Sequence, residues 1–326
     1  MWRRAGSCSN DGPCSRDCGG RLPLTRHRTG PAGTRCDART VPGAVGPGSQ
    51  IPALGRLAEA HFDAIAILRE ADREPPTPAR FGVWAAGGPN PATIRQTGTT
   101  LELTGEKHWC SGASIATHAL VTAADEASNA LVLVDLAADG VRLSDSDWTS
   151  PAFHEVDTRT VMFQVELTDG DVIGVDDWYL RRPGFWHGAV GVAACWAGCA
   201  DGLVGRIRDE WRTDDHALAH LGAIDATLWT MRAMIDAAGR EIDAAPHDVP
   251  AAHVLALRVR GQVDLMVGDI TTRIARAIGP GPLAHRTDLH TALVETDLYR
   301  RQCHAERDLA DLGDLTLHAP DDDAIV

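Results

Sequence analysis

The spacing of hydrophobic residues changes twice along the chain. Between residues 51 and 70, apolar side chains recur at three- and four-residue intervals, which predicts an amphipathic helix that stops before Pro75-Pro76. From residue 81 to 183, short apolar runs are bounded by Gly and Asp, which predicts strands. Long helical periods return over residues 184–315. The pattern therefore predicts an α+β fold with a short helical segment (51–80), a β domain (81–183), a helical bundle (184–315) and a tail (316–326).

The predicted strands are short, and turn-forming residues separate them. The first, from Phe81 to Ala86, breaks at Gly87-Gly88-Pro89, and another is expected to end in a turn at Thr104-Gly105. Strands of this length and spacing are typical of an antiparallel barrel or sandwich. The predicted strands cover residues 81–86, 101–104, 119–123, 132–134, 160–165 and 172–175.

Four long helices are predicted in the C-terminal part. The first is rich in Gly and Ala, which allows close helix approach. The Gly279-Pro280-Gly281-Pro282 run separates the third helix from the fourth. Gly313 is the expected C-cap of the last helix, and Asp321-Asp322-Asp323 belongs to a frayed tail. The predicted helices cover residues 185–211, 216–243, 250–278 and 288–311.

The first 50 residues differ in composition from the rest. They are rich in Arg, Gly, Pro, Ser and Cys and lack a periodic apolar pattern. A disordered leader is favoured, and the alternative is an aberrant segment that is foreign to the native protein. The spacing of the cysteines contains no C-x2-C pair, so a zinc site is not predicted for Cys8, Cys14, Cys18 and Cys36.

The net charge and the hydropathy of the chain argue against some classes of binding partner. A net charge of -14 argues against non-specific binding to nucleic acid or to an anionic membrane. The sequence has no run of 18 apolar residues and no recognisable secretory signal. We therefore expect a cytoplasmic protein with reduced cysteines.

The stretch from Leu101 to Asp125 carries the candidate chemistry. Within it, Lys107-His108-Trp109-Cys110 leads into a corner of small residues, Ser111-Gly112-Ala113. An indole, a hydroxyl and free backbone amides at one corner form a place where a flat ring with a heteroatom edge can bind. The alternative is a hairpin with a core tryptophan, which the spacing by itself favours.

Residues 103–113, LTGEKHWCSGA, resemble the signature L-x-G-x-K-x-W-I-[TS]-x-[AG] of the acyl-CoA dehydrogenase superfamily. The following strand at 119–123 and the Asp135…Gly140-Val141 element are also similar to that family, so the resemblance covers residues 55–315. It implies N-terminal helices, a middle β domain, a C-terminal four-helix bundle and bound FAD. The family's flavin-packing Trp and flavin-bonding hydroxyl match Trp109 and Ser111.

Other family segments are altered in this chain. Only the last helix or so of the first domain is present, as a remnant at 51–80. Ala85 to Pro89 replaces the flavin-contacting T-E-P segment, which leaves Trp84 and the backbone of Ala86 as expected contacts. The pyrophosphate-binding R-x-x-F-G motif is replaced by a stretch with Arg208 and Arg212. Since a neighbouring subunit supplies that contact in the family, the resemblance implies a homodimer or homotetramer in which Arg212 binds the cofactor.

The resemblance does not place a catalytic base, because loop 279–290 contains no Glu. His304 is the candidate acid/base: it precedes Asp308 by four residues on the predicted last helix, where the carboxylate can orient the imidazole. Monooxygenases of the superfamily carry a His on that helix. A solvated, salt-bridged helix end is the alternative, and His187 is a second candidate. No metal site is predicted, since the His216–His220 pair has no recognisable third ligand.

Three functions remain open at this point. The leading hypothesis is FAD-dependent α,β-dehydrogenation of an acyl-CoA thioester, with a possible electron-transfer partner. The second is a flavin-dependent monooxygenase with His304 as the acid/base. The third is an inactive, flavin-free family member that serves as a binding or scaffold subunit. A Rossmann or P-loop nucleotide domain is not expected, because the sequence contains neither glycine motif.

Overall fold

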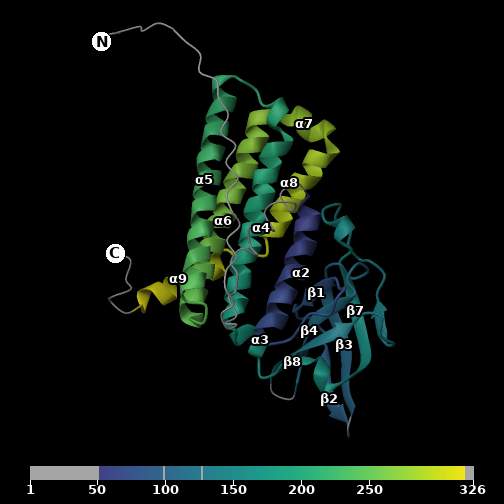
Figure 1. Ribbon diagram of the computed structural model, residues 1–326. Coiled ribbons are helices and arrows are strands. Elements are labelled where there is room, and N and C mark those ends of the chain that lie inside the picture. The colour runs from purple at the N-terminus through teal and green to yellow at the C-terminus, as the bar shows by residue number, and fades with distance from the viewer. Residues whose placement is uncertain (1–50, 98–99, 126–127, 320–326) are drawn as a thin grey trace, which may run out of the picture. The chain divides into compact units, whose positions relative to one another are not determined.

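The computed structural model describes residues 51–97, 100–125 and 128–319, so the predicted leader and the acidic end of the tail lie outside the described residues. Within the described part, a β-sheet and a set of long helices lie on either side of helix α2 (Pro52–Glu70) (Figure 1). The fold is thus the predicted α+β arrangement of an N-terminal helix, a central β domain and C-terminal helices.

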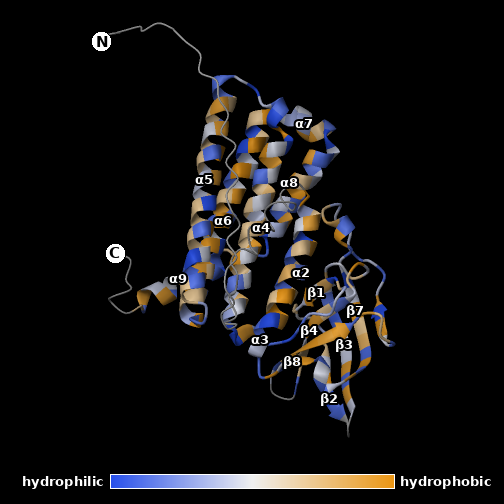
Figure 2. Ribbon diagram, viewed as in Figure 1, coloured by the Kyte–Doolittle hydropathy of each residue, from blue (hydrophilic) through white to orange (hydrophobic). Residues whose placement is uncertain are grey.

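Helix α2 forms where the apolar period predicts it, and a proline occupies its first turn. Its apolar residues Ala64, Ile67 and Leu68 pack against Leu120 and Leu131 of the sheet. The same helix also contacts α4 (Pro183–Arg206) of the bundle. Figure 2 shows hydrophobic residues along α2 and on the strands next to it. Because both neighbours cover α2, it joins the β domain to the helical bundle.

The eight strands described form one sheet in the order β6-β7-β3-β2-β4-β5-β8, with β1 paired to β4. Side chains alternate between its two faces: Ala119, Val121 and Ala123 enter the core of the β domain, while Leu120 faces α2. The strands are β1 (Phe81–Trp84), β2 (Thr93–Thr97), β3 (Thr100–Cys110), β4 (His118–Ala124), β5 (Asn129–Asp135), β6 (Val141–Leu143), β7 (Arg159–Leu167) and β8 (Val172–Gly174).

The sheet is mixed and not wholly antiparallel as the spacing predicted. Strands β1 and β2 both pair with β4 in parallel. The prediction rested on short distances between consecutive strands, which favour hairpins. Here the β2–β3 hairpin lies between β1 and β4 in the sequence. After this hairpin, β4 runs in the same direction as β1, and the two strands pair in parallel.

Strand β3 is also longer than predicted, because the expected turn at Thr104-Gly105 does not form. Gly105 instead lies inside the strand with a φ of +100°, a conformation that favours glycine. A Cβ at this position would lie 2.6 Å from the carbonyl oxygen of Pro91. Glycine is therefore required by the close approach of the 90–92 segment to β3.

Gly105→Ala is expected to destabilise the fold by about 1–3 kcal/mol, because it adds backbone strain and a steric clash. Gly222→Ala, in the middle of helix α5 (Asp215–Ala244), is the matched control, since an added Cβ there meets nothing within 4 Å. That change should stabilise by about 0.5–1 kcal/mol. Urea unfolding of both variants measures the difference, and equal effects would contradict the strain argument.

The helical part is built around α4, α5, α6 (Val249–Ile278) and α8 (Thr287–Arg300), which lie side by side in Figure 1. Their shared core includes Trp196, Ile224 and Ile270, each fully buried. Helix α4 is long and apolar enough to cross a membrane, but 56% of its apolar window is buried inside the protein, as in a core helix. The remaining helices are α3 (Trp178–Arg181), α7 (Pro280–His285) and α9 (Glu306–Leu317).

The predicted last helix is interrupted, which corrects the sequence-based boundary. Helix α8 ends at Arg300, α9 begins at Glu306, and Gly313 lies inside α9 and is not a C-cap. The sequence between them contains neither Pro nor Gly, so no local signal marks the break. Tertiary contacts hold it instead: Arg260 on α6 donates to the carbonyl of Gln302 over 2.7 Å, and Cys303 is buried.

Candidate functional site

A cavity of about 710 Å³ lies between the β domain and the helices. Its wall is formed by one face of α2, the end of β1 and the segment after it, Trp109 at the end of β3, α3, α4, α6 and the α8–α9 break. This volume is within the range of about 300–1,000 Å³ that is usual for small-molecule sites. Four of the predicted site residues line it: Trp84, Ala86, Trp109 and His304.

Trp109 is presented to the cavity by an irregularity in β3. The pairing of β3 with β7 shifts register between Lys107 and Cys110, and Trp109 has a φ of +60°. A bulge of this kind re-aims a side chain out of the sheet, and positive φ is unusual for a bulky residue. As a result, Trp109 is 66% exposed, and its ring meets that of Trp148 edge to face at 6.1 Å. The structure therefore excludes the core-tryptophan alternative.

The segment beside Trp109 is fixed by Lys107, the only lysine in the sequence. Its buried ammonium donates to the carbonyl of Ala86 over 3.2 Å and to Thr122 Oγ1 over 2.7 Å. Burial lowers the pKa of Lys107 to about 8. The lysine of the sequence signature thus holds the chain that replaces the T-E-P segment against the cavity.

The pKa of Lys107 predicts a pH dependence of stability. The unfolded chain keeps this proton up to pH 10.5 while the folded chain releases it near pH 8, so stability should rise between these values. We expect wild type to gain about 3 kcal/mol relative to Lys107→Met over this interval. Urea unfolding at pH 7.5, 9 and 10.5 measures the difference. The cysteines titrate in both proteins, so only the difference between wild type and Lys107→Met reports on Lys107. If the free energy of unfolding changes equally with pH in both proteins, the pKa of about 8 for Lys107 is contradicted.

Two of the predicted site residues, Ser111 and Arg212, are not among the residues that line the cavity. The hydroxyl of Ser111 lies 3.3 Å from Thr158 Oγ1, while its carbonyl accepts from Trp84 Nε1 over 3.2 Å. Ser111 thus positions the Trp84 ring, and its flavin contact stays a prediction. Arg212 lies outside the cavity, is more than half exposed and pairs with Asp214 over 2.8 Å.

His304 reaches the cavity from the break between α8 and α9, and not from within a helix as predicted. The predicted partner is nevertheless correct: Asp308 lies 3.2 Å from His304 Nδ1 and also accepts the backbone N–H of His304 over 3.1 Å. The imidazole is 58% exposed. Asp308 therefore orients the ring and also holds the backbone of His304 next to the start of α9.

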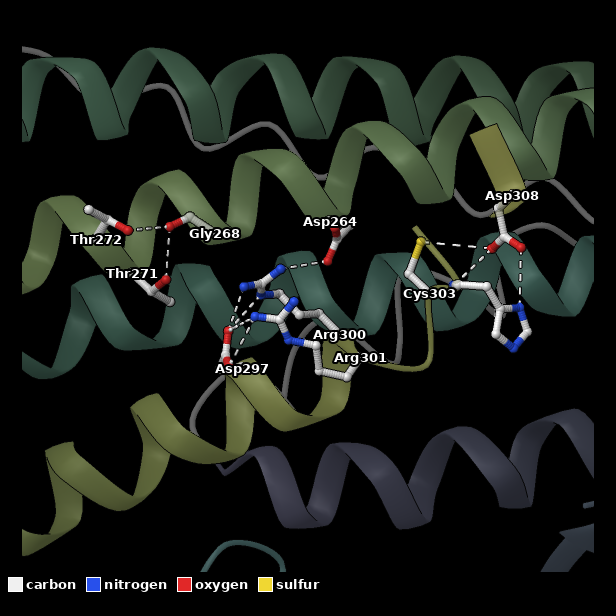
Figure 3. Close-up of polar contacts among 10 residues, drawn as sticks. Asp264, Gly268, Thr271, Thr272, Asp297, Arg300, Arg301, Cys303 and Asp308 are labelled. Carbon is white, nitrogen blue, oxygen red and sulfur yellow. Dashed lines mark hydrogen bonds and ion pairs between the residues drawn. The ribbon is translucent and has the colours of Figure 1, made fainter. Parts of the chain in front are cut away.

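Figure 3 shows the environment of this break. Arg300 points toward Asp264 and Asp297, with nitrogen–oxygen distances of 2.7 Å and 2.5 Å. Figure 3 also places Cys303 beside Asp308. The ion pairs of Arg300 fix the end of α8 to α6.

The other histidine candidates do not line the cavity. Nε2 of His187 is buried without a hydrogen-bond partner, and burial lowers its pKa. The rings of His216 and His220 lie 4.6 Å apart on α5. Among the residues that the structure describes, no group of three potential metal ligands occurs.

Sequence reasoning missed the charged wall formed by α2. Arg56, Glu59 and Asp63 all line the cavity. Arg56 pairs with Glu59 over 2.8 Å, and Glu59 also accepts from the hydroxyl of Tyr299 over 3.2 Å. The three-, four- and seven-residue intervals among these polar positions are the signal that could have revealed a shared helical face.

A second charged group comes from the start of α4. Arg182, only 4% exposed, donates to Glu70 over 2.6 Å and lies 3.9 Å from Asp63. Its guanidinium also lies over the ring of Tyr179 at 5.2 Å. Burial raises the pKa of Asp63 to about 6, although Arg182 opposes the shift. The cavity therefore holds a carboxyl that can exchange a proton near neutral pH.

Comparison with known proteins matches this fold to flavin monooxygenases. The methanesulfinate monooxygenase MsuC from Pseudomonas fluorescens has a TM-score of 0.72 at 16% identity, over 86% of this chain and 82% of that chain. TdsC from Paenibacillus sp. A11-2, with FMN and indole, has a TM-score of 0.75 at 16% identity, over 85% and 82%. KijD3, in complex with FMN and dTDP-3-amino-2,3,6-trideoxy-4-keto-3-methyl-D-glucose, has a TM-score of 0.72 at 16% identity, over 84% and 77%.

No family model matches the chain, and no curated protein matches it significantly. The structural likeness establishes the fold, which is that of acyl-CoA dehydrogenase-like monooxygenases, as the sequence signature implied.

Proposed function

We propose that this protein is a flavin-dependent monooxygenase that binds FMN against Trp109. The observation that carries the proposal is the exposed indole at the bulge of β3, on the wall of a cavity large enough for a small molecule. TdsC and KijD3, which share the fold, are described with FMN, so FMN replaces the FAD expected from the sequence.

The residues of the cavity have distinct roles in this proposal. Trp109 packs on the flavin ring, and Lys107 holds the backbone of Ala86 beside it. His304, oriented by Asp308, moves a proton at the cavity rim. Reduced flavin, when bound, supplies the electrons that let dioxygen transfer one oxygen atom to a substrate. A separate reductase is the expected partner, and Arg212 of a neighbouring subunit is the proposed phosphate ligand.

Acyl-CoA dehydrogenation, the leading hypothesis from the sequence, is the rival function. It requires a carboxylate near the flavin to remove the α-proton, and Asp63 and Glu59 on the cavity wall keep that chemistry open. It differs from monooxygenation in the source of the flavin's electrons, which the substrate itself provides.

Flavin titration followed by an anaerobic challenge tests the proposal. We expect FMN to bind more tightly than FAD, and acyl-CoA thioesters from four to sixteen carbons to leave the flavin bands unbleached. The FMN-loaded protein, reduced anaerobically, should then consume oxygen when air is admitted. Bleaching by a thioester would establish the dehydrogenase, and failure to bind either flavin would favour the inactive scaffold.

A further inference from the structure

We propose that the substrate carries a protonated amine, and that the Asp63 carboxylate binds the ammonium group and accepts its proton. This inference rests on the proposed function, because a free amine nitrogen is an atom to which a flavin monooxygenase can transfer oxygen. It adds a substrate class and a second proton-transfer residue to the site described above.

The position of Asp63 leaves one side of its carboxylate open to the cavity. Asp63 projects from α2, and Gly188 on α4 lies opposite. A Cβ at Gly188 would approach Asp63 Oδ1 to 3.0 Å. Because residue 188 is glycine, a ligand atom can reach the carboxylate from the side of α4.

Carboxylates outnumber guanidinium groups around Asp63. Arg56 is engaged by Glu59, and Arg182 is engaged by Glu70. The closest approach of Arg182 to Asp63 is 3.9 Å, which is beyond hydrogen-bond distance. These two guanidinium groups therefore face three carboxylates, and Asp63 is the one without a close cationic partner. A bound ammonium group would complete the pairing.

The opposite wall does not supply the missing cation. Arg260 donates to the carbonyls of Ala189 and Gln302 and lies over the ring of Trp196. At the α8–α9 break, the carboxylates of Asp308 and Asp311 bond His304 and His253, and Arg307 is the arginine beside them. The excess of carboxylates over guanidinium groups on the α2 wall is therefore not offset by Arg260.

Aromatic rings surround the same part of the cavity. Tyr179, Phe185 and Trp186 line it, and successive rings meet edge to face at 5.5 and 5.1 Å. Arg182 already lies over Tyr179 and His253 stacks on Trp186, so these rings offer a ligand apolar surface for the carbon skeleton that bears the amine. A carboxylate among aromatic rings therefore suits an ammonium ion on an apolar body.

The proton transfer balances without a further reactant. The N–H bond of R–NH3⁺ breaks, the proton forms an O–H bond with Asp63, and the electron pair remains on nitrogen as the lone pair of R–NH2. No group is oxidised or reduced in this step. The pKa of Asp63 near 6 makes its carboxylate a base at neutral pH.

Three indole compounds of similar size and different charge test the inference: tryptamine, neutral tryptophol and anionic indole-3-acetate. Calorimetric titration at pH 7.5 should show tryptamine binding at least tenfold more tightly than either of the others. Asp63→Asn should reduce this preference to less than about twofold. Asp201→Asn, at an exposed pair with Arg232, is the matched control and should retain it.

A second variant and a pH series complete the test. Gly188→Ala keeps the carboxylate but narrows access to it, so it should also weaken tryptamine binding. Between pH 7.5 and 5, protonation of Asp63 should weaken binding to wild type by about tenfold and leave Asp63→Asn unchanged. The charged and titratable groups facing Asp63 are Arg56, Glu59 and Glu70 of α2, Tyr179 of α3, and Arg182.

Several outcomes would overturn the inference: equal binding of tryptophol, tighter binding of indole-3-acetate, an undiminished preference in Asp63→Asn, or no binding of any of the three. Separate FMN titration distinguishes this failure from failure of the proposed function. Protein that binds FMN without preferring the amine refutes the inference alone. Protein that prefers the amine and binds no flavin refutes the proposed function alone.

Discussion

Trp109→Ala is expected to weaken FMN binding by about 10- to 100-fold, the largest effect on ligand affinity that the site predicts. The indole is 66% exposed on the cavity wall, so its removal takes away a stacking surface without opening the core. Titration of flavin fluorescence measures the affinity. Trp109→Phe, which keeps an aromatic face, should lie between wild type and Trp109→Ala.

Trp229 provides the control for this prediction. It is 71% exposed on α5 and lies outside the cavity, so Trp229→Ala removes an equally exposed indole elsewhere. FMN affinity should be unchanged in that variant, and both variants should unfold at nearly the same urea concentration as wild type. Equal loss of FMN affinity in both would show that Trp109 has no specific role.

Arg182→Met is expected to destabilise the fold by about 3–5 kcal/mol, the largest effect on stability among these predictions. The Arg182 side chain is 2% exposed and joins α2 to the start of α4 through Glu70 and Asp63. Removing its charge leaves Glu70 without its cation in a poorly solvated place and takes away the positive charge nearest to Asp63. Urea unfolding at pH 7.5 measures the loss.

Two further variants separate the ion pair from general damage to the fold. Glu70→Gln added to Arg182→Met should recover part of the lost stability, because it removes one unpaired carboxylate. Arg232→Met breaks an ion pair in which the arginine is 63% exposed and should cost less than about 1 kcal/mol. A cost for Arg182→Met as small as that for Arg232→Met would contradict the structural role of Arg182.

Patterns within short stretches predicted much of the fold. The apolar period located α2, α5 and α6, since each buries one helical face. The break after Arg300 was not predictable, because Arg260, more than 40 residues earlier, holds the carbonyl of Gln302. Parallel pairing of β1 with β4 likewise depends on strands that are distant in sequence.

The residues of the candidate site also differ in whether local sequence could identify them. Trp109 and Lys107 could be identified from the sequence, because they lie two residues apart at the end of one strand. Asp63, Arg182 and Tyr179 were not, since helix α2 and the α3–α4 region meet only in the folded chain. Their relevance depends on burial and on distances between elements, which spacing along the sequence does not encode.

The sequence by itself determined the class of fold, the helices α2, α5 and α6 and the stretch that presents Trp109, because backbone periodicity is a local property. Tertiary structure alone decided that the indole is exposed, that Lys107 secures the segment at Ala86, and that His304 lies at a helix break. It also decided that the Asp63 carboxylate has no close cation of its own, since charge balance arises only where separate elements meet.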